Sequence, residues 1–221
     1  MSAVNYCTTR RALRGRGGVS LVEIMVGMTI SVMMMAAISM AVQTQNRSSA
    51  RETMRVDMTH ALQNTMLLME RDLRMTGYLS GTSCVDCEAG SITTADQTSI
   101  TIVYDTDDDG DREAVTFRRD QAGDAGYDAD HPRMVRIDAG GAIFPLAANI
   151  TGLSIQYFDS AGTQIADAAI NTSTGTQTNR DTIRSIRVTI SARSARSTTG
   201  PGAGFMTDSL TFRVTPRNYI T

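Results

Sequence analysis

Residues 19–42 read VSLVEIMVGMTISVMMMAAISMAV, and this stretch decides the fold prediction for the whole chain. Glu23 is the only ionisable side chain in the run. About 20 consecutive apolar residues are enough for a helix to cross the hydrocarbon core of a bilayer. The run therefore predicts a membrane-spanning helix that begins close to residue 19.

The charge of the chain changes at the start of this run. Residues 1–18 carry Arg10, Arg11, Arg14 and Arg16 and no acid, although the whole chain has a formal net charge of −2. Basic segments that flank a spanning helix stay in the cytoplasm. We therefore expect a cytoplasmic leader, an inner-membrane precursor and an exported acidic body. An acidic body repels the phosphates of nucleic acid, so nucleic acid is not expected as the main partner.

An ordinary secretory signal is the rival interpretation of this N-terminal segment. Such a signal has a shorter apolar core and a cleavage site of small residues. Ser39-Met40-Ala41, directly before Val42, offers such a site. This interpretation leaves Glu23 and the Gly17-Gly18 pair unexplained, and it stays open as an alternative.

The helical pattern continues beyond the apolar run in amphipathic form. Apolar side chains recur three or four residues apart at Met54, Met58, Leu62, Met66, Met69 and Leu73. This is the period of one helix face, and Gly77 follows as a C-cap glycine would. A helix from Val19 to Thr76 would be about 87 Å long. We interpret the methionines of the stripe as core packing rather than as a metal or cofactor site.

Short alternating segments with turn residues between them follow Gly77, as is typical of antiparallel strands. The predicted strands cover residues 99–104, 114–118, 134–137, 142–144, 153–158, 183–191 and 210–215. The fold class is therefore α+β, with a long N-terminal helix whose second half packs on the antiparallel β-sheet of a single C-terminal body. The expected divisions are a leader at 1–18, an apolar helix at 19–45, an amphipathic helix at 46–77 and a β-rich head at 78–221.

The segment Gly18-Val19-Ser20-Leu21-Val22-Glu23 resembles the cleavage motif of type IV pilins and pseudopilins. In that family a prepilin peptidase cuts after the glycine and methylates the new N-terminus. The resemblance implies cleavage after Gly18, methylation of Val19 and a role in assembly for Glu23. The family usually has Phe where this chain has Val19.

Membrane energetics support a special role for Glu23. A carboxylate within an apolar span costs about 2.5–3.5 kcal/mol on insertion scales, so it predicts a functional site. Cleavage after Gly18 would create an amine at Val19 that can neutralise Glu23 in the same chain or in a neighbour. The alternative is that Glu23 lies at the membrane interface and reaches the headgroups.

Later segments resemble the PilW-like minor pilins and the J-type pseudopilins of type II secretion. They are 70–78 (ERDLRMTGY), 145–158 (PLAANITGLSIQYF), 183–188 (IRSIRV) and 216–219 (PRNY). The resemblance implies a structural subunit, most like a minor pilin, with other pilin subunits, the prepilin peptidase and the inner membrane as partners. It also implies a periplasmic or extracellular filament as the final location.

An acidic loop joins the first two predicted strands. Its alternating aspartates are Asp105, Asp107, Asp109 and Asp111. With Gly110 they match the first half of a calcium loop, in which alternating carboxylates converge on the cation. Thr116 stands where such loops have their bidentate Glu. Calcium is therefore the one cofactor considered, with a solvated Asp-Gly hairpin turn as the alternative.

Cys84 and Cys87 form a Cys-x-x-Cys pair that fits a redox centre, half of a metal site or a structural disulfide. We favour the disulfide, since exported domains meet an oxidising compartment and the pair precedes β structure. His60 and His131 do not combine with a nucleophile and an acid in the sequence, so we expect no enzyme activity and no required cofactor.

The sequence is compatible with three functions. The first is a structural subunit of a type IV pilus, and the second is a pseudopilin that works in a secretion piston. The third is a membrane-anchored, calcium-dependent adhesin or sensor that never polymerises. Cleavage by the prepilin peptidase would disfavour the third, while the first two share the same N-terminal signal.

Overall fold

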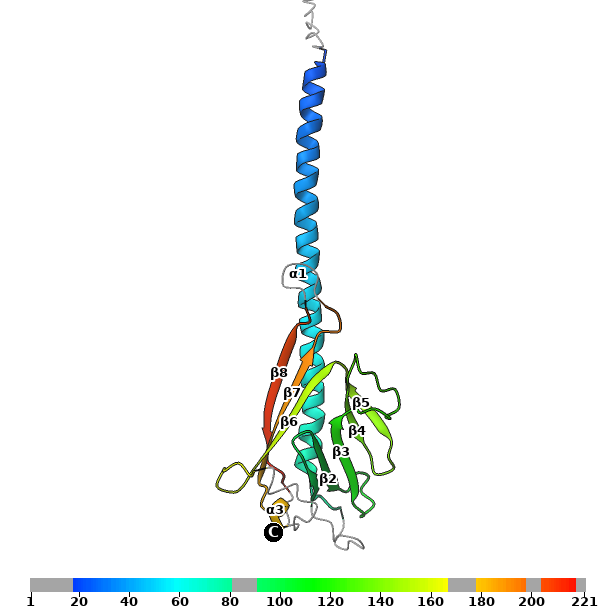
Figure 1. Cartoon of the computed structure of the whole chain (residues 1–221), viewed down its shortest axis with the longest axis vertical. Helices are drawn as coiled ribbons and strands as arrows, with labels where there is room; N and C mark the ends of the chain where they lie inside the picture. Colours follow the sequence, from blue (N-terminus) through cyan, green and yellow to red (C-terminus); the bar gives the residue numbers. More distant parts are fainter. Residues whose placement is uncertain (1–17, 81–90, 167–177, 198–203, 218–221) are drawn as a thin grey trace, which may run out of the picture. The chain divides into compact units, whose positions relative to one another are not determined.

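The computed structural model describes residues 18–80, 91–166, 178–197 and 204–217 (Figure 1). Its elements are α1 (Leu21–Met75), β1 (Ile92–Ala95), β2 (Ser99–Tyr104), β3 (Glu113–Arg119), β4 (Met134–Ile137), β5 (Ile143–Ala147), β6 (Ile150–Phe158), α3 (Thr178–Asp181), β7 (Ser185–Arg193) and β8 (Thr207–Val214). The chain divides into two compact units, one up to Ser49 and one from Ala50. The α+β layout is confirmed, with the long helix packed on antiparallel sheets.

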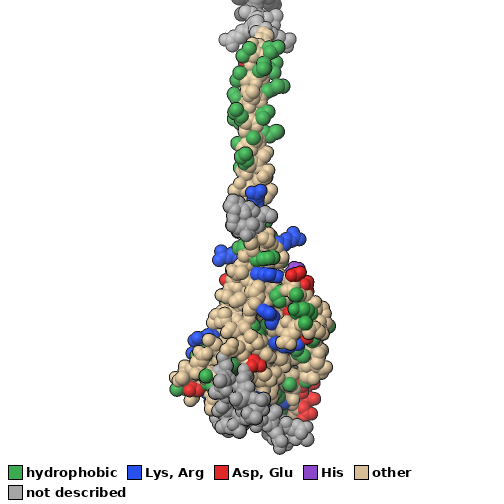
Figure 2. Space-filling model, in the orientation of Figure 1, with side chains coloured by type: hydrophobic (Ala, Val, Ile, Leu, Met, Phe, Trp, Pro, Cys, Tyr) green, Lys and Arg blue, Asp and Glu red, His purple; other side chains and the backbone are tan. Residues whose placement is uncertain are grey.

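The first unit consists, in its described part, of the apolar portion of α1. Every side chain from residue 18 to residue 49 is exposed, and hydrophobic side chains run along this portion (Figure 2). By length and composition α1 can cross a membrane. The carbonyl of Ser20 accepts hydrogen bonds from the N–H groups of Glu23 (2.9 Å) and Ile24 (3.2 Å), so the helix begins just after Ser20.

In the second unit, the rest of α1 supplies one side of the core. Met58, Leu62, Met69 and Leu73 are buried, and the other two members of the predicted stripe are half-buried. The interpretation of the stripe as core is therefore confirmed. Gly77 follows the helix with φ of +80°, a left-handed conformation that glycine adopts without a Cβ clash. Its N–H donates to the carbonyl of Val103 over 2.9 Å, which ties the helix end to β2.

The strands form two antiparallel sheets rather than the one sheet that the sequence analysis expects. Strands β1 to β5 pair in sequence order in the first sheet, and β6, β7 and β8 pair in the second. Between them Asn149 adopts φ of +61°, which turns the chain from β5 into β6. Alternation along a strand shows which face is buried, but it does not show which strands pair, so the division into two sheets was missed.

The strand positions agree closely with the predicted ones, and one strand was not predicted. The predicted strands at 99–104 and 134–137 coincide with β2 and β4, and the others are shifted by a few residues at their ends. The additional strand is β1, Ile92–Ala95. It pairs with β2 at the edge of the first sheet.

Both sheets contribute to one apolar core with the second half of α1. The largest fully buried side chains from the strands include Ile100, Ile102, Phe117, Ile155, Tyr157 and Ile186. In β7 the buried positions alternate with half-buried ones, as the sequence predicts. Asp72 departs from prediction, because the helical pattern places it among the polar positions of α1 and the structure buries it to 1% exposure.

Candidate functional site

The residues of the expected cleavage site lie just before α1. Gly18 and Val19 are exposed and belong to no helix or strand, and Val19 is 69% exposed. A Cβ added to Gly18 would meet nothing within 4 Å. Among the described residues, therefore, no neighbouring side chain or backbone lies against Gly18. The leader up to residue 17 lies outside the residues that the structure describes.

Glu23 stands in the first turn of α1. With Ser20 as the N-cap residue, Ser20 and Glu23 have the spacing of a capping box. The negative charge of Glu23 in this turn also interacts favourably with the positive end of the helix dipole. Residues 18–46 contain no Lys or Arg, so in this stretch no cationic side chain can pair with Glu23. This position is compatible with two roles for Glu23, a helix cap and a partner for a cation from outside the stretch, and it does not decide whether Glu23 lies at the membrane interface.

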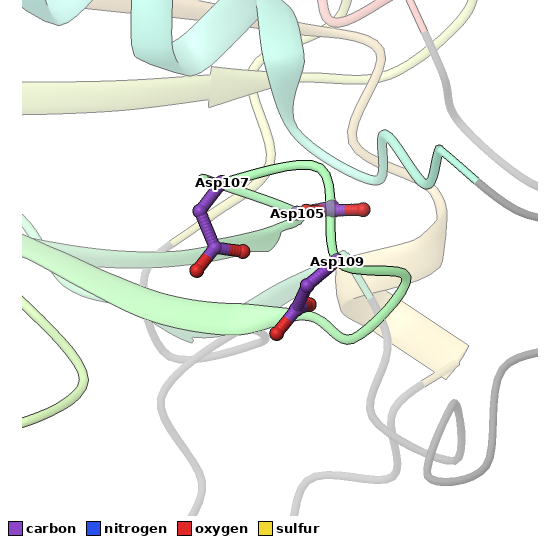
Figure 3. A group of neighbouring side chains, drawn as sticks. All are labelled: Asp105, Asp107 and Asp109. Atoms are coloured by element: carbon purple, nitrogen blue, oxygen red, sulfur yellow. The ribbon is translucent and has the colours of Figure 1, made fainter.

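The aspartates of the acidic loop come together between β2 and β3 (Figure 3). Asp105, Asp107 and Asp109 each offer a carboxylate oxygen, and these oxygens lie within 4.8 Å of one another. Asp105 is buried, whereas Asp107 and Asp109 are exposed. Asp111 does not belong to this group, and its backbone N–H donates to Oδ1 of Asp109 over 2.9 Å.

Asp105 organises this loop through its own hydrogen bonds. Its Oδ2 accepts from the Ser80 hydroxyl (2.6 Å), the Ser80 N–H (3.1 Å) and the Gly110 N–H (3.1 Å). Its Oδ1 accepts from the N–H of Asp108 over 2.7 Å. The Ser80 hydroxyl is the largest cause that lowers the pKa of Asp105 to about 2. This carboxylate therefore stays ionised and fastens the loop to the segment that follows α1.

The surroundings of Asp107 disfavour its ionised form. Loss of hydration raises the pKa of Asp107, and the charge of Asp109 adds to this rise. The charge of Asp108 in turn raises the pKa of Tyr78. A cation among these carboxylates would relieve the repulsion. Thr116 does not supply a further ligand to this group, because it lies in β3 with its hydroxyl 2.9 Å from that of Thr101.

The remaining candidate residues lie apart from these two sites. Cys84 and Cys87 fall outside the described residues. His60 is exposed on α1, and Nδ1 of His131 lies 2.9 Å from the Asp128 carboxylate in an exposed turn. The hydrogen bond with His131 lowers the pKa of Asp128.

The sequence patterns did not predict the contacts between charged side chains, and two of these arrangements stand out. One is the ion pair between Asp72 of α1 and Arg136 of β4. The other is a stack in the second sheet, in which the guanidinium groups of Arg187 and Arg213 lie 4.8 Å and 4.7 Å from the ring centroid of Phe158. The alternating polar positions of β7 include Arg187, but only the register with β8 shows that Arg213 lies opposite.

Comparison with known families identifies the relationship of the chain. Residues 51–214 match the family model for prepilin peptidase-dependent protein B. No curated protein matches the chain. The matched region begins after the apolar run and the Gly18–Glu23 segment, so it is independent of the motif that first suggested pilins. The chain therefore belongs to the prepilin peptidase-dependent protein B family, a pilin-like family associated with pili.

Proposed function

We propose that this chain is a structural subunit of a type IV pilus, of the PilW-like minor type. It is made as an inner-membrane precursor, cut after Gly18 by the prepilin peptidase, methylated at Val19 and assembled through α1. One observation carries the proposal. The head matches a family named for its dependence on prepilin peptidase, while the separate N-terminal region joins Gly18 to an apolar helix with Glu23 in its first turn.

The apolar part of α1 suits both stages of this life cycle. In the precursor its exposed apolar side chains face lipid, and in a filament they face the same helices of neighbouring subunits. Cleavage leaves the new amine at Val19 four residues before Glu23 in the sequence. The carboxylate of one subunit then neutralises this amine as subunits dock, because an unpaired charge inside an apolar bundle is costly.

The amphipathic part of α1 and the two sheets form the head that the filament displays. Tertiary contacts such as those of Met69 and Leu73 with the core hold this part of the helix to the strands. The head therefore moves with the helix when α1 leaves the membrane. The β2–β3 loop supplies the calcium site that we propose as an accessory to this head.

A J-type pseudopilin is the alternative assignment, since it would use the same anchor, cleavage and docking. Deletion of the gene for this chain distinguishes the pilus subunit from the pseudopilin. Loss of surface fibres with normal protein secretion supports the pilus subunit, and loss of secretion with normal fibres supports the pseudopilin. A membrane-anchored adhesin or sensor would show neither loss and would remain in the membrane fraction.

The mature N-terminus tests the proposal. Filaments are sheared from cells, and the chain is analysed by N-terminal peptide mass spectrometry, with cells that lack the prepilin peptidase as the control. We expect an N-methylated chain that begins at Val19 in filaments and an intact leader in the control cells. A chain that begins at Val42 would instead establish a secretory signal and contradict the proposal.

A further inference from the structure

The outward face of the β6–β7–β8 sheet is polar and carries no acid. The three strands lie side by side (Figure 1), and their register places the outward residues in rows that cross the sheet. Two neighbouring rows are Ser154–Thr189–Thr211 and Gln156–Arg187–Arg213. We call the residues of these two rows the arginine face. Asp208 is the only acid in the three strands, and its register partner is the buried Ala192 on the inward side.

Two guanidinium groups are held side by side on this face. Those of Arg187 and Arg213, which are register partners, lie 4.8 Å and 4.7 Å from the ring centroid of Phe158. Arg213 donates to the Ser185 hydroxyl at 3.0 Å and 2.6 Å, and Arg187 donates to the amide oxygen of Gln156 at 3.4 Å. Like charges directly opposite each other are unfavourable between strands. In the described part of the chain no salt bridge compensates either charge.

This pair of cations suits an anion with two oxygens. A guanidinium group has five N–H donors in a planar fork that matches a carboxylate, and the bonds to Ser185 and Gln156 use only some of them. An anion between the two groups would also relieve their mutual repulsion. Because stacking and hydrogen bonds already hold the guanidinium groups, binding needs little further ordering of side chains. The charges therefore indicate an oxyanion as the ligand or as part of it.

The neighbouring row supplies hydroxyls beside the arginines. The hydroxyl oxygens of Thr189 and Thr211 are 2.9 Å apart, and each hydroxyl can both donate and accept, as the hydroxyls of a sugar do. Neither row contains an apolar side chain, whereas the centre of a protein interface is usually apolar or aromatic. The ring of Phe158 is only 6% exposed, so it offers no platform on which nucleic-acid bases could stack. Hydroxyls and cations without apolar surface favour a sugar with an acidic group.

We propose that the arginine face binds a sugar unit that carries one carboxylate, as a uronic acid does. The carboxylate lies between Arg187 and Arg213, and hydroxyls of the sugar ring bond to Thr189 and Thr211. A single acidic group fits this head better than a long polyanion does, because residues 105–113 contain five aspartates and one glutamate that would repel a polyanion. The inference adds a carbohydrate ligand to the head and does not depend on filament assembly.

Saturation-transfer difference NMR on the full-length chain in detergent micelles tests this site. The probes are methyl glucuronide and methyl glucoside, in which a carboxylate replaces a hydroxymethyl group. We expect saturable binding of the glucuronide and none of the glucoside, a comparison that needs no variant. Arg187→Gln with Arg213→Gln should weaken glucuronide binding at least about tenfold. Arg71→Gln, which removes an exposed arginine of α1, should leave it unchanged. Absent glucuronide binding, equal binding of both probes, or equal affinity in the arginine double variant overturns the proposal.

A second pair of substitutions tests the contribution of the hydroxyls. Thr189→Val with Thr211→Val keeps both arginines and should weaken glucuronide binding about tenfold, because two hydrogen bonds to the sugar are lost. An unchanged affinity would leave a site for a bare carboxylate and overturn the sugar ligand. A hexaglutamate peptide or a hexathymidylate oligonucleotide that binds this face more tightly than the glucuronide would assign it to a protein or a nucleic acid and overturn the proposal. The assay uses no filament, so its failure rejects only this ligand, whereas absence of the chain from filaments rejects the proposed function.

Discussion

Asp72 of α1 and Arg136 of β4 form an ion pair that joins the long helix to the first sheet. Nε of Arg136 donates to Oδ2 of Asp72 over 3.0 Å, and Asp72 is only 1% exposed. Arg136 also donates to Asp138 and, over 3.3 Å, to the hydroxyl of Tyr104. Removal of the arginine would leave the carboxylate of Asp72 buried without its partner from the sheet.

We therefore predict that Arg136→Ala destabilises the head by about 3–5 kcal/mol, the usual cost of breaking a buried ion pair. Arg71 is the matched control, because it also contacts Asp72, at 3.2 Å, but its side chain is 74% exposed. Arg71→Ala should cost no more than about 1 kcal/mol. Urea unfolding of the full chain in detergent, followed by near-ultraviolet circular dichroism, measures both. Equal losses in the two variants would contradict the role given to Arg136.

This ion pair is a contact that local sequence patterns do not predict. Asp72 occurs among polar positions between members of the apolar stripe, and Arg136 lies 64 residues further along the chain. Helix period and strand alternation are local patterns, so they predicted α1 and most strands correctly. Contacts between distant segments, including this pair and the separation into two sheets, depend on tertiary structure and were not predicted.

The candidate sites follow the same division. The Gly18–Glu23 segment is a local motif that a few consecutive residues are enough to recognise. The spacing of Asp105, Asp107 and Asp109 is also local, and the structure brings their carboxylates together. The hydrogen bond between Asp105 and Ser80 could not be predicted, because Ser80 lies 25 residues earlier in the chain. The stack of Arg187 and Arg213 on Phe158 could not be predicted either, because it depends on how β6, β7 and β8 align with one another.

The second prediction concerns the pH dependence of the head. The folded pKa of Asp105, about 2, lies below the usual value for aspartate. Its stabilising effect is therefore present above about pH 4 and is lost as the pH falls toward 2. Asp105→Asn should lower the melting temperature at pH 7 and weaken its fall between pH 4 and 2. Thermal unfolding of the full chain at several pH values measures this, with the exposed Asp111→Asn as control. An unchanged acid profile in Asp105→Asn would contradict the assignment.

The third prediction is that the acidic loop between β2 and β3 binds calcium weakly, with a dissociation constant of about 0.1–1 mM, as in extracellular modules. Calcium at several millimolar should raise the melting temperature of the full chain. Asp107→Asn should abolish this rise, because it removes one of the three grouped carboxylates, whereas Asp111→Asn should preserve it. No thermal shift and no heat in isothermal titration would leave only the hairpin turn.

The fourth prediction is a disulfide between Cys84 and Cys87 in exported protein, because the exported head meets an oxidising compartment. Filament protein is alkylated before and after reduction, and the cysteine peptides are weighed by mass spectrometry. We expect labelling only after reduction, with protein from the cytoplasm of export-deficient cells as the reduced control. Two thiols that label freely in exported protein would refute the disulfide.

The fifth prediction addresses Glu23 and separates its two structural roles. A charge partner for the Val19 amine requires a carboxylate, whereas a capping-box residue can be Glu or Gln. If Glu23 neutralises the amine during docking, Glu23→Gln and Glu23→Ala should both fail in assembly, while Glu23→Asp retains part of it. If Glu23 only caps the helix, Glu23→Gln should assemble normally.

Fractionation of cells that express Glu23→Ala is the most direct test of the proposed role of Glu23 in filament assembly. The membrane and sheared-filament pools are compared with wild type, and the cleavage state of the chain is measured in each pool. We predict normal insertion and cleavage after Gly18, since the variant removes a costly charge from the apolar span. We also predict a filament pool reduced by orders of magnitude, because the amine of Val19 would enter the bundle unpaired. A cleaved Glu23→Ala chain that enters filaments at the wild-type level would contradict the claim that Glu23 neutralises the Val19 amine during docking.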